Sequence, residues 1–163
     1  MKAHTILETI GHTPHIRINR LFGANHHVWI KSERSNPGGS IKDRIALSMI
    51  EDAEKNGRLK PGQRILEPSS GNTGIALAAI AKIKGYPITI LMPTSVSIER
   101  RQMLEVFGAD IILTPGEEGS NGAVSRAQEM AAQHPEWCFL YQYANDANPR
   151  AHFEGTGPEI WRD

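Results

Sequence analysis

The sequence has one cysteine, Cys138, among its 163 residues, and this scarcity excludes an intrachain disulfide. A chain without disulfides is typical of a reducing compartment, and we therefore expect a cytoplasmic location. Cys138 lies in an apolar run over residues 137–141, where a small buried side chain is expected rather than a nucleophile. The seven histidines show no paired ligand spacing, so no metal site is expected.

Excess charge and long apolar runs are also missing. Eighteen basic residues balance eighteen acidic residues, which argues against nucleic-acid and anionic-membrane partners. No apolar run is long enough to cross a bilayer, and the first residues lead into no signal-peptide core. What remains is a chain with 39% hydrophobic residues, which is enough for one domain with a core.

Short apolar segments alternate with segments of helical periodicity. Strands are expected at residues 28–31, 64–67, 88–91, 110–113 and 138–142, and helices at 41–56, 72–84, 98–107 and 122–133. Ser40 and Asp43 predict a capping box at the start of the first helix, and glycines follow three of the helices. This alternation predicts the α/β class, with a parallel sheet covered by helices on both faces in a three-layer αβα arrangement.

The loop over residues 67–74 opens a helix and is rich in small polar residues. It contains Ser69, Ser70, Gly71, Asn72 and Thr73. In parallel sheets, ligands bind in the loops at the carboxyl ends of the strands. Small residues let a ligand approach the backbone, and helix N–H groups beside hydroxyls form an anion site. Taken alone, the loop is compatible with a bound phosphate, a bound carboxylate or a well-capped turn.

A second loop, residues 35–44, places Lys42 in the first turn of a helix after a Pro-Gly-Gly-Ser run. The positive end of a helix disfavours a cation, so a lysine there is electrostatically unusual. Such a position favours the neutral amine, which is the form that makes a Schiff base. The alternative is a solvated lysine on a helix surface, and Lys42 taken by itself favours that alternative.

Residues outside these two loops give weaker signals. Arg100 and Arg101 follow Ser97 near the start of a helix, where two basic side chains are typical of a solvated face. Trp29 and Trp161 are expected to pack rather than to stack on a ligand.

Four segments together resemble a known enzyme family. They are residues 11–14 (Gly-His-Thr-Pro), 36–44 (Asn-Pro-Gly-Gly-Ser-Ile-Lys-Asp-Arg), 67–78 (Glu-Pro-Ser-Ser-Gly-Asn-Thr-Gly-Ile-Ala-Leu-Ala) and 155–161 (Gly-Thr-Gly-Pro-Glu-Ile-Trp). In order and spacing they resemble O-acetylserine sulfhydrylase (cysteine synthase), a fold-type II enzyme that depends on pyridoxal 5'-phosphate (PLP). The resemblance covers essentially the whole chain, and residues 93–101 are similar to the helix of the family's mobile subdomain.

The resemblance implies a role for each matched residue. Lys42 would hold PLP as a Schiff base and later carry the substrate α-proton. Asn72 would hydrogen-bond the ring oxygen of the cofactor. The substrate α-carboxylate would be held by the loop, with Gln142 closing on it; the loop residues are Ser69, Ser70, Gly71 and Thr73.

The implied reaction is a β-replacement by a PLP-dependent transferase, in which O-acetyl-L-serine loses acetate and sulfide adds to give L-cysteine. The resemblance also implies a homodimer and, as a partner, the C-terminal peptide of serine acetyltransferase. Cystathionine β-synthase and other sulfhydrylases of an activated serine remain alternatives. A non-catalytic fragment that acts only in binding or dimerisation is an alternative of another class.

Family members continue past the segment that ends near residue 161, so we expect this chain to be an N-terminal part that is inactive alone. By the resemblance, the remainder carries a Gly/Thr-rich loop for the PLP phosphate and a serine that faces the pyridine nitrogen. Residues 1–36 are expected to form strands that pack with that C-terminal domain. Residues 37–163 are expected to form the N-terminal lobe that binds cofactor and substrate, with a mobile subdomain at about 87–133.

Overall fold

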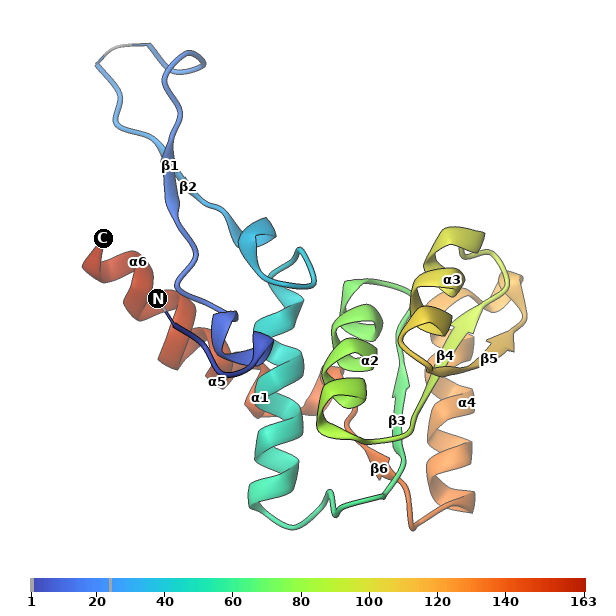
Figure 1. Ribbon diagram of the computed structural model, residues 1–163. Coiled ribbons are helices and arrows are strands. Elements are labelled where there is room, and N and C mark those ends of the chain that lie inside the picture. The colour runs from blue at the N-terminus through green and yellow to red at the C-terminus, as the bar shows by residue number, and fades with distance from the viewer. Residues whose placement is uncertain (1, 24) are drawn as a thin grey trace.

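Four parallel strands form the central sheet of the computed structural model, which describes residues 2–23 and 25–163 (Figure 1). The strands are β3 (Ile65–Pro68), β4 (Ile88–Pro93), β5 (Asp110–Thr114) and β6 (Cys138–Phe139). Their order is β5-β4-β3-β6, and Ile65 lies opposite both Ile88 on β4 and Cys138 on β6. The predicted α/β class with a parallel sheet is confirmed.

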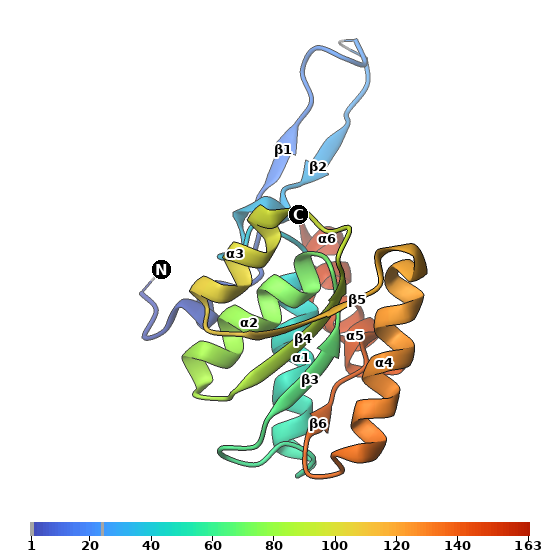
Figure 2. The same ribbon diagram turned by 90° about the vertical axis from the view of Figure 1, so that its right-hand side faces the viewer.

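Helices cover both faces of this sheet (Figures 1 and 2). One face carries α2 (Asn72–Lys84) and α3 (Ile98–Val106), with α1 (Lys42–Lys55) packed against α2, and the other face carries α4 (Gly119–Gln133). Side chains alternate along the strands, so Ile65 and Ile90 join the core under α1 and α2, whereas Leu66 and Leu91 join the core under α4. The three-layer prediction is therefore confirmed.

Helix α2 is apolar on nearly all sides because it lies between α1 and the sheet. Its alanines let both neighbours approach closely, and Ala76, Ala78 and Ala81 are buried. Gly85 ends the helix in the left-handed conformation with φ 80°, as the sequence predicted. The buried helix therefore has a fixed position, and its N-terminus lies at the carboxyl end of β3.

Two local predictions were wrong. The capping box at α1 does not form: Ser40 Oγ accepts the N–H of Lys42 instead of that of Asp43, and the Asp43 carboxylate accepts the N–H of Gly38 instead of that of Ser40. The strand expected over residues 138–142 ends at Phe139. Tyr141 adopts a left-handed conformation with φ 50°, which turns the chain out of the sheet into a 3-10 helix at Gln142–Ala144.

The N-terminal strands form a separate two-stranded antiparallel sheet, β1 (His15–Arg17) with β2 (Trp29–Lys31). This hairpin projects away from the central sheet in both views (Figures 1 and 2). Its apolar side chains are exposed, and Trp29 is 54% exposed. Trp161 on α6 (Gly157–Arg162) is 91% exposed. The sequence predicted that both tryptophans pack, but neither is buried among the residues that the structure describes. In the part of the chain that the structure describes, no helix is both long and apolar enough to span a bilayer.

Candidate functional site at the carboxyl ends of β3 and β6

The chain reverses its direction of winding between β3 and β6. From β3 it passes outward through α2, β4, α3 and β5, and then α4 crosses the opposite face and returns the chain to β6 beside β3 (Figure 2). Ligands of such sheets bind in the crevice at the carboxyl ends of the strands, at this switch in strand order. The segments after β3 and β6 therefore mark where a site is expected.

A hollow of about 370 Å³ lies at this place. All seven residues predicted to form the site line it: Lys42, Ser69, Ser70, Gly71, Asn72, Thr73 and Gln142. They come from the start of α1, from the β3–α2 loop and from the 3-10 helix after β6. The fold thus brings together residues up to a hundred positions apart in the sequence.

The β3–α2 loop is shaped by the hydroxyl of Ser69, which is buried. Ser69 Oγ accepts the N–H of Gly74 at 2.9 Å and that of Gly71 at 3.4 Å. A Cβ at Gly74 would lie 3.1 Å from the Ser69 carbonyl oxygen, so the loop closes best with glycine there. The hydroxyl of Ser69 accepts these bonds while its own proton stays available to a ligand.

Thr73 and Gln142 connect the two segments that follow β3 and β6. Thr73 Oγ1 donates to Gln142 Oε1 at 2.9 Å, and Gln142 Nε2 donates to the carbonyl of Pro68 at 3.4 Å. Both residues line the hollow at the positive end of α2, where an anion is stabilised. A carboxylate could therefore be held here by a hydroxyl, an amide and the helix terminus together.

Lys42 is the first residue of α1 and is half-buried. Its backbone N–H donates to Ser40 Oγ at 3.1 Å, whereas no hydrogen bond or ion pair reaches its Nζ from residues 2–23 or 25–163. The preceding turn needs glycine, because a Cβ at Gly38 would lie 2.5 Å from Asp43 Oδ1. The turn is thus fixed while the amine at the hollow keeps its donors for a ligand.

Three further residues belong to this region although the sequence did not single them out as ligands. Arg100 is exposed, as predicted, but it also lines the hollow, and its Nη1 donates to the Ser70 carbonyl at 3.0 Å. Arg101 caps the preceding turn instead of facing solvent, with Nη2 donating to Val96 O at 3.1 Å. Tyr143 also lines the hollow. Its place after β4 could have indicated that Arg100 lies near the site, because β3 and β4 are parallel and their carboxyl ends share one edge of the sheet.

His152 lies near Lys42 and was not predicted as a site residue. Burial lowers the pKa of His152, and the positive charges of Lys42 and Arg44 lower it further. Its Nδ1 lies 3.0 Å from Thr156 Oγ1 within a π-helical turn, His152–Thr156. Such turns occur often at functional sites, and the neutral imidazole is the form that this environment favours.

Glu67 is a fully buried carboxyl group directly behind the hollow. It is the third residue of β3, and its Oε1 accepts the N–H of Gln142 at 3.1 Å. Burial raises the pKa of Glu67 to about 7, and hydrogen bonds from backbone N–H groups at the turn limit the rise. Glu67 is the first residue of the matched segment 67–78, but no role was predicted for it from the sequence.

The matched segments outside the hollow meet at a buried ion cluster around Arg44. Arg44 Nε lies 2.7 Å from Glu33 Oε2, its Nη1 lies 2.7 Å from Glu159 Oε1, and Lys31 Nζ lies 2.8 Å from Glu159 Oε2. Thr13 Oγ1 donates to Glu33 Oε1 at 2.6 Å. The hydrogen bonds from Arg44 hold the pKa of Glu159 well below its usual range. This cluster fixes the start of α1, two residues from Lys42.

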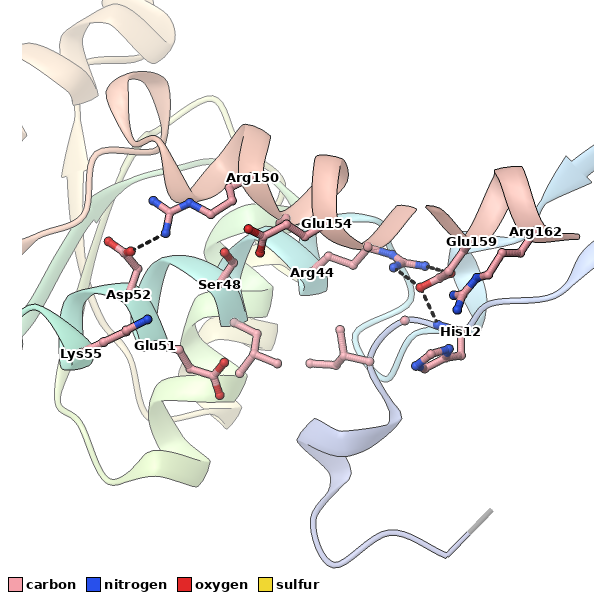
Figure 3. A pocket seen from close by; sticks show the side chains of 15 residues that line it. His12, Arg44, Ser48, Glu51, Asp52, Lys55, Arg150, Glu154, Glu159 and Arg162 are labelled. Atoms are coloured by element: carbon pink, nitrogen blue, oxygen red, sulfur yellow. Dashed lines mark hydrogen bonds and ion pairs between the residues drawn. The ribbon is translucent and has the colours of Figure 1, made fainter. Parts of the chain in front are cut away.

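A second hollow, of about 460 Å³, lies between residues 10–12, α1 and the C-terminal helices (Figure 3). It contains none of the predicted site residues. Arg150 pairs with Asp52 at 2.8 Å, and Arg44 pairs with Glu159, so much of its charge is already neutralised. It also lies away from the carboxyl ends of the strands. We therefore assign the candidate site to the hollow at β3 and β6.

Comparisons of sequence identify the family of the chain. Residues 6–163 match the family model described as pyridoxal-phosphate dependent enzyme. The chain is 53% identical over 163 residues to a cysteine synthase of Flavobacterium sp., covering 100% of this chain and 53% of that relative. It is 51% identical over 156 residues to cysteine synthase A of Escherichia coli, covering 95% of this chain and 48% of that relative. The chain thus spans about half the length of the curated relatives it matches.

Solved structures give the same fold. The crystal structure of an O-ureido-L-serine synthase superposes with a TM-score of 0.96 at 44% identity, covering 100% of this chain and 51% of that one. A cysteine synthase of Entamoeba histolytica superposes with a TM-score of 0.93 at 38% identity, again over 100% of this chain and 50% of that one. With a family match over residues 6–163, the chain belongs to the pyridoxal-phosphate dependent enzymes.

Proposed function

We propose that this chain supplies the cofactor lysine and the substrate-binding loop of a cysteine synthase, which makes L-cysteine from O-acetyl-L-serine and sulfide. One observation carries the proposal: Lys42, residues 69–73 and Gln142 line a single hollow at the switch between β3 and β6. The identity of 53% and 51% to two cysteine synthases supports the same chemistry.

The residues of the hollow fit pyridoxal phosphate. Lys42 presents an amine that has no partner among the described residues, and an amine is what the aldehyde of the cofactor requires. Asn72 lines the same hollow, and its amide would donate to the ring oxygen. We propose that the phosphate and the ring nitrogen are held by the part of the relatives that this chain does not cover.

When bound, pyridoxal phosphate supplies the electron sink for loss of the α-proton and of acetate. Lys42 Nζ would remove the α-proton and return it after sulfide has added. Thr73 and Gln142 would hold the α-carboxylate at the N-terminus of α2, together with Ser69, Ser70 and Gly71. On binding, Thr73 would exchange its hydrogen bond with Gln142 Oε1 for one with the carboxylate. The leaving acetate would thus be held in one orientation relative to Lys42.

We also propose that residues 1–36 pack with the C-terminal domain of the complete enzyme. The exposed apolar side chains of the hairpin support this, since Ile16, Trp29 and Ile30 are each about half exposed in the part of the chain that the structure describes. Residues 87–133 would move as the substrate binds. The complete enzyme would be a cytoplasmic homodimer that binds the C-terminal peptide of serine acetyltransferase, as the family resemblance implies.

The proposed function is tested by fixing the cofactor to its lysine. The full-length gene product is incubated with pyridoxal phosphate, reduced with borohydride, digested and analysed by mass spectrometry. We expect the label on the peptide that contains Lys42, and no label in Lys42→Ala. Lys55→Ala, on the last turn of the same helix, is the matched control and should retain the label. Label on any other lysine would refute the assignment.

A second candidate activity is the formation of O-ureido-L-serine. The superposition with an O-ureido-L-serine synthase at a TM-score of 0.96 supports it. Both products require replacement at the β-carbon of a serine derivative, so the same hollow would serve either nucleophile. Supplying O-acetyl-L-serine with sulfide or with hydroxyurea in parallel, and comparing kcat/KM for the two products, separates the candidates. A higher value with sulfide supports the cysteine synthase.

A further inference from the structure

The hydrogen-bond ladder between β3 and β6 stops at the edge of the hollow, and side chains replace its next rung. Cys138 N–H donates to the Arg64 carbonyl at 2.7 Å, and Leu140 N–H donates to the Leu66 carbonyl at 3.3 Å. Continuation of the ladder would join Gln142 N–H to the Pro68 carbonyl. Instead, Gln142 N–H donates to Glu67 Oε1 at 3.1 Å, and the Gln142 side chain reaches the Pro68 carbonyl at 3.4 Å.

This exchange depends on two unfavourable features. Tyr141 has φ 50°, a conformation that costs free energy for a residue with a side chain. Glu67 is 0% exposed, and its Oε2 has no hydrogen-bond partner among the residues that the structure describes. An apolar side chain at position 67 would avoid the cost of burying a carboxyl group. A strained turn and a costly buried carboxyl therefore meet beside the hollow, where stability alone does not explain them.

We infer that Glu67 is a positioning residue: its Oε1 holds the Tyr141–Gln142 turn against β3 and thereby directs the Gln142 side chain into the hollow. This role rests on the proposed function of Gln142 as a ligand of the substrate carboxylate. Glu67 itself does not line the hollow, so it acts through Gln142.

The contacts form a line from the core to the site. Glu67 Oε1 binds the backbone of Gln142, and Gln142 Oε1 accepts from Thr73 Oγ1 at 2.9 Å. Asn148 Nδ2 holds the same residue from the opposite side through the Gln142 carbonyl, at 3.0 Å. Glu67 is the member of this line that comes from the central sheet, so it sets the distance between the turn and α2. Both the neutral and the ionised carboxyl group can accept at Oε1.

Two substitutions show whether Glu67 positions Gln142 through its hydrogen bond or only fills space in the core. Glu67→Met keeps the approximate volume but removes the acceptor for Gln142 N–H. We expect KM for O-acetyl-L-serine to rise about tenfold, with kcat changed less than about threefold, since one hydrogen bond to a substrate ligand is misaligned. Glu67→Gln keeps an oxygen that can accept at the same place and should bring KM back to within about threefold of the wild type. The absorbance of bound pyridoxal phosphate should be the same in all three proteins.

The measurements are made on the full-length gene product, together with Gln142→Ala. A wild-type KM in a folded Glu67→Met protein would overturn the inference, and so would equal changes in the Met and Gln variants. Should the Met variant fail to fold, Glu67→Asp makes the same test, because its carboxyl is one methylene too short to reach Gln142 N–H. A wild-type KM in that variant also overturns the inference.

Gln142→Ala distinguishes the inference from the function on which it rests. If Gln142→Ala raises KM but Glu67→Met does not, only the role of Glu67 is wrong. If Gln142→Ala leaves KM unchanged, Gln142 does not bind the substrate carboxylate, and both the ligand assignment and the positioning role are wrong.

Discussion

Lys42 and Arg44 lie two residues apart at the start of α1 and have opposite surroundings. Arg44 is buried and pairs with two carboxylates, Glu33 and Glu159, through bonds of 2.7 Å. Lys42 Nζ faces a hollow and has no ion pair with any described residue. A buried cation whose three nitrogens all donate hydrogen bonds is held in place, whereas an amine without a counter-charge is available for chemistry.

The contrast indicates that two residues of one helix turn have different roles: Arg44 fixes the backbone, and Lys42 supplies the reactive amine. The Arg44 cluster joins the segment at Thr13, the start of α1 and α6, and so fixes the backbone that carries Lys42. A reactive side chain needs a rigid backbone and an unoccupied head group at the same time. Four predictions test whether the Arg44 cluster governs stability while Lys42 and the hollow govern activity.

The largest effect is expected for Lys42→Ala. Removing the amine should lower the rate of cysteine formation by about 10²–10⁴-fold, because no other described residue of the hollow offers an amine to move the α-proton. The free energy of unfolding of the cofactor-free protein should change by less than about 0.5 kcal/mol, since the Lys42 side chain makes no hydrogen bond or ion pair with any described residue. Steady-state kinetics and urea unfolding of the full-length gene product measure both quantities. Turnover of Lys42→Ala at the wild-type rate would show that Lys42 is not the reactive residue.

Arg44→Met should have the opposite profile. It leaves the partly buried Glu33 carboxylate without a charged partner and the buried Glu159 carboxylate with Lys31 alone, so unfolding should become easier by about 3–5 kcal/mol. The matched control is Arg150→Met, which removes an ion pair with Asp52 that is largely at the surface. The control should cost at most about 1 kcal/mol. Equal losses in the two variants would show that burial of the Arg44 cluster does not govern its contribution.

A smaller effect is expected for Thr73→Val, which keeps the shape of the side chain and removes its hydroxyl. Binding of O-acetyl-L-serine should weaken by about 1.5–3 kcal/mol, the usual cost of losing a hydrogen bond to a charged group. Thr89→Val is the control, because Thr89 is also buried but pairs with Arg64 away from the hollow. If Thr73→Val instead releases the cofactor and leaves substrate affinity unchanged, the loop serves the cofactor.

Periodicity was sufficient to predict the central sheet and its four covering helices. The helix over Asn72–Lys84 was predicted with its observed bounds, because alanine-rich spacing and Gly85 define both ends locally. The residues of the β3–α2 loop that line the hollow could also be singled out, since they are contiguous in the sequence. Local signals of this kind need no knowledge of distant contacts.

Features that depend on distant contacts were not predicted. The Arg44–Glu159 bond joins residues 115 positions apart, and no periodicity encodes it. The helices α5 (Ala147–Ala151) and α6 contain Pro149 and Pro158, which by themselves indicate a break. α5 forms because it packs on α1. The left-handed turn at Tyr141 was missed because no glycine marks it.

The smallest expected effect is the pH dependence of stability. It should have opposite signs for Glu67, beside the hollow, and for Glu159, in the Arg44 cluster. Burial raises the pKa of Glu67 from its ordinary value of 4.5 to about 7, so the folded protein holds this proton more tightly than the unfolded chain does. The stability that Glu67 contributes is therefore fully present below about pH 4.5 and is lost as the pH rises through about 7. For Glu159 the pKa is lowered by its bonds with Arg44, so its contribution is present above the ordinary value of 4.5 and is lost as the pH falls.

Urea unfolding of the wild type, Glu67→Gln and Glu159→Gln as a function of pH separates the two contributions. Between about pH 6 and pH 8 the wild type should lose on the order of 1 kcal/mol relative to Glu67→Gln, because only the wild type carries the titrating carboxyl at position 67. Over the same range the difference between the wild type and Glu159→Gln should stay constant, and it should shrink only in acid. Parallel curves for the wild type and Glu67→Gln above pH 6 would mean that Glu67 is already ionised there. The Glu67 carboxylate would then be held by charge-assisted hydrogen bonds, as the Glu159 carboxylate is. Only the amine of Lys42, unpaired among the described residues, would then distinguish the hollow from the Arg44 cluster.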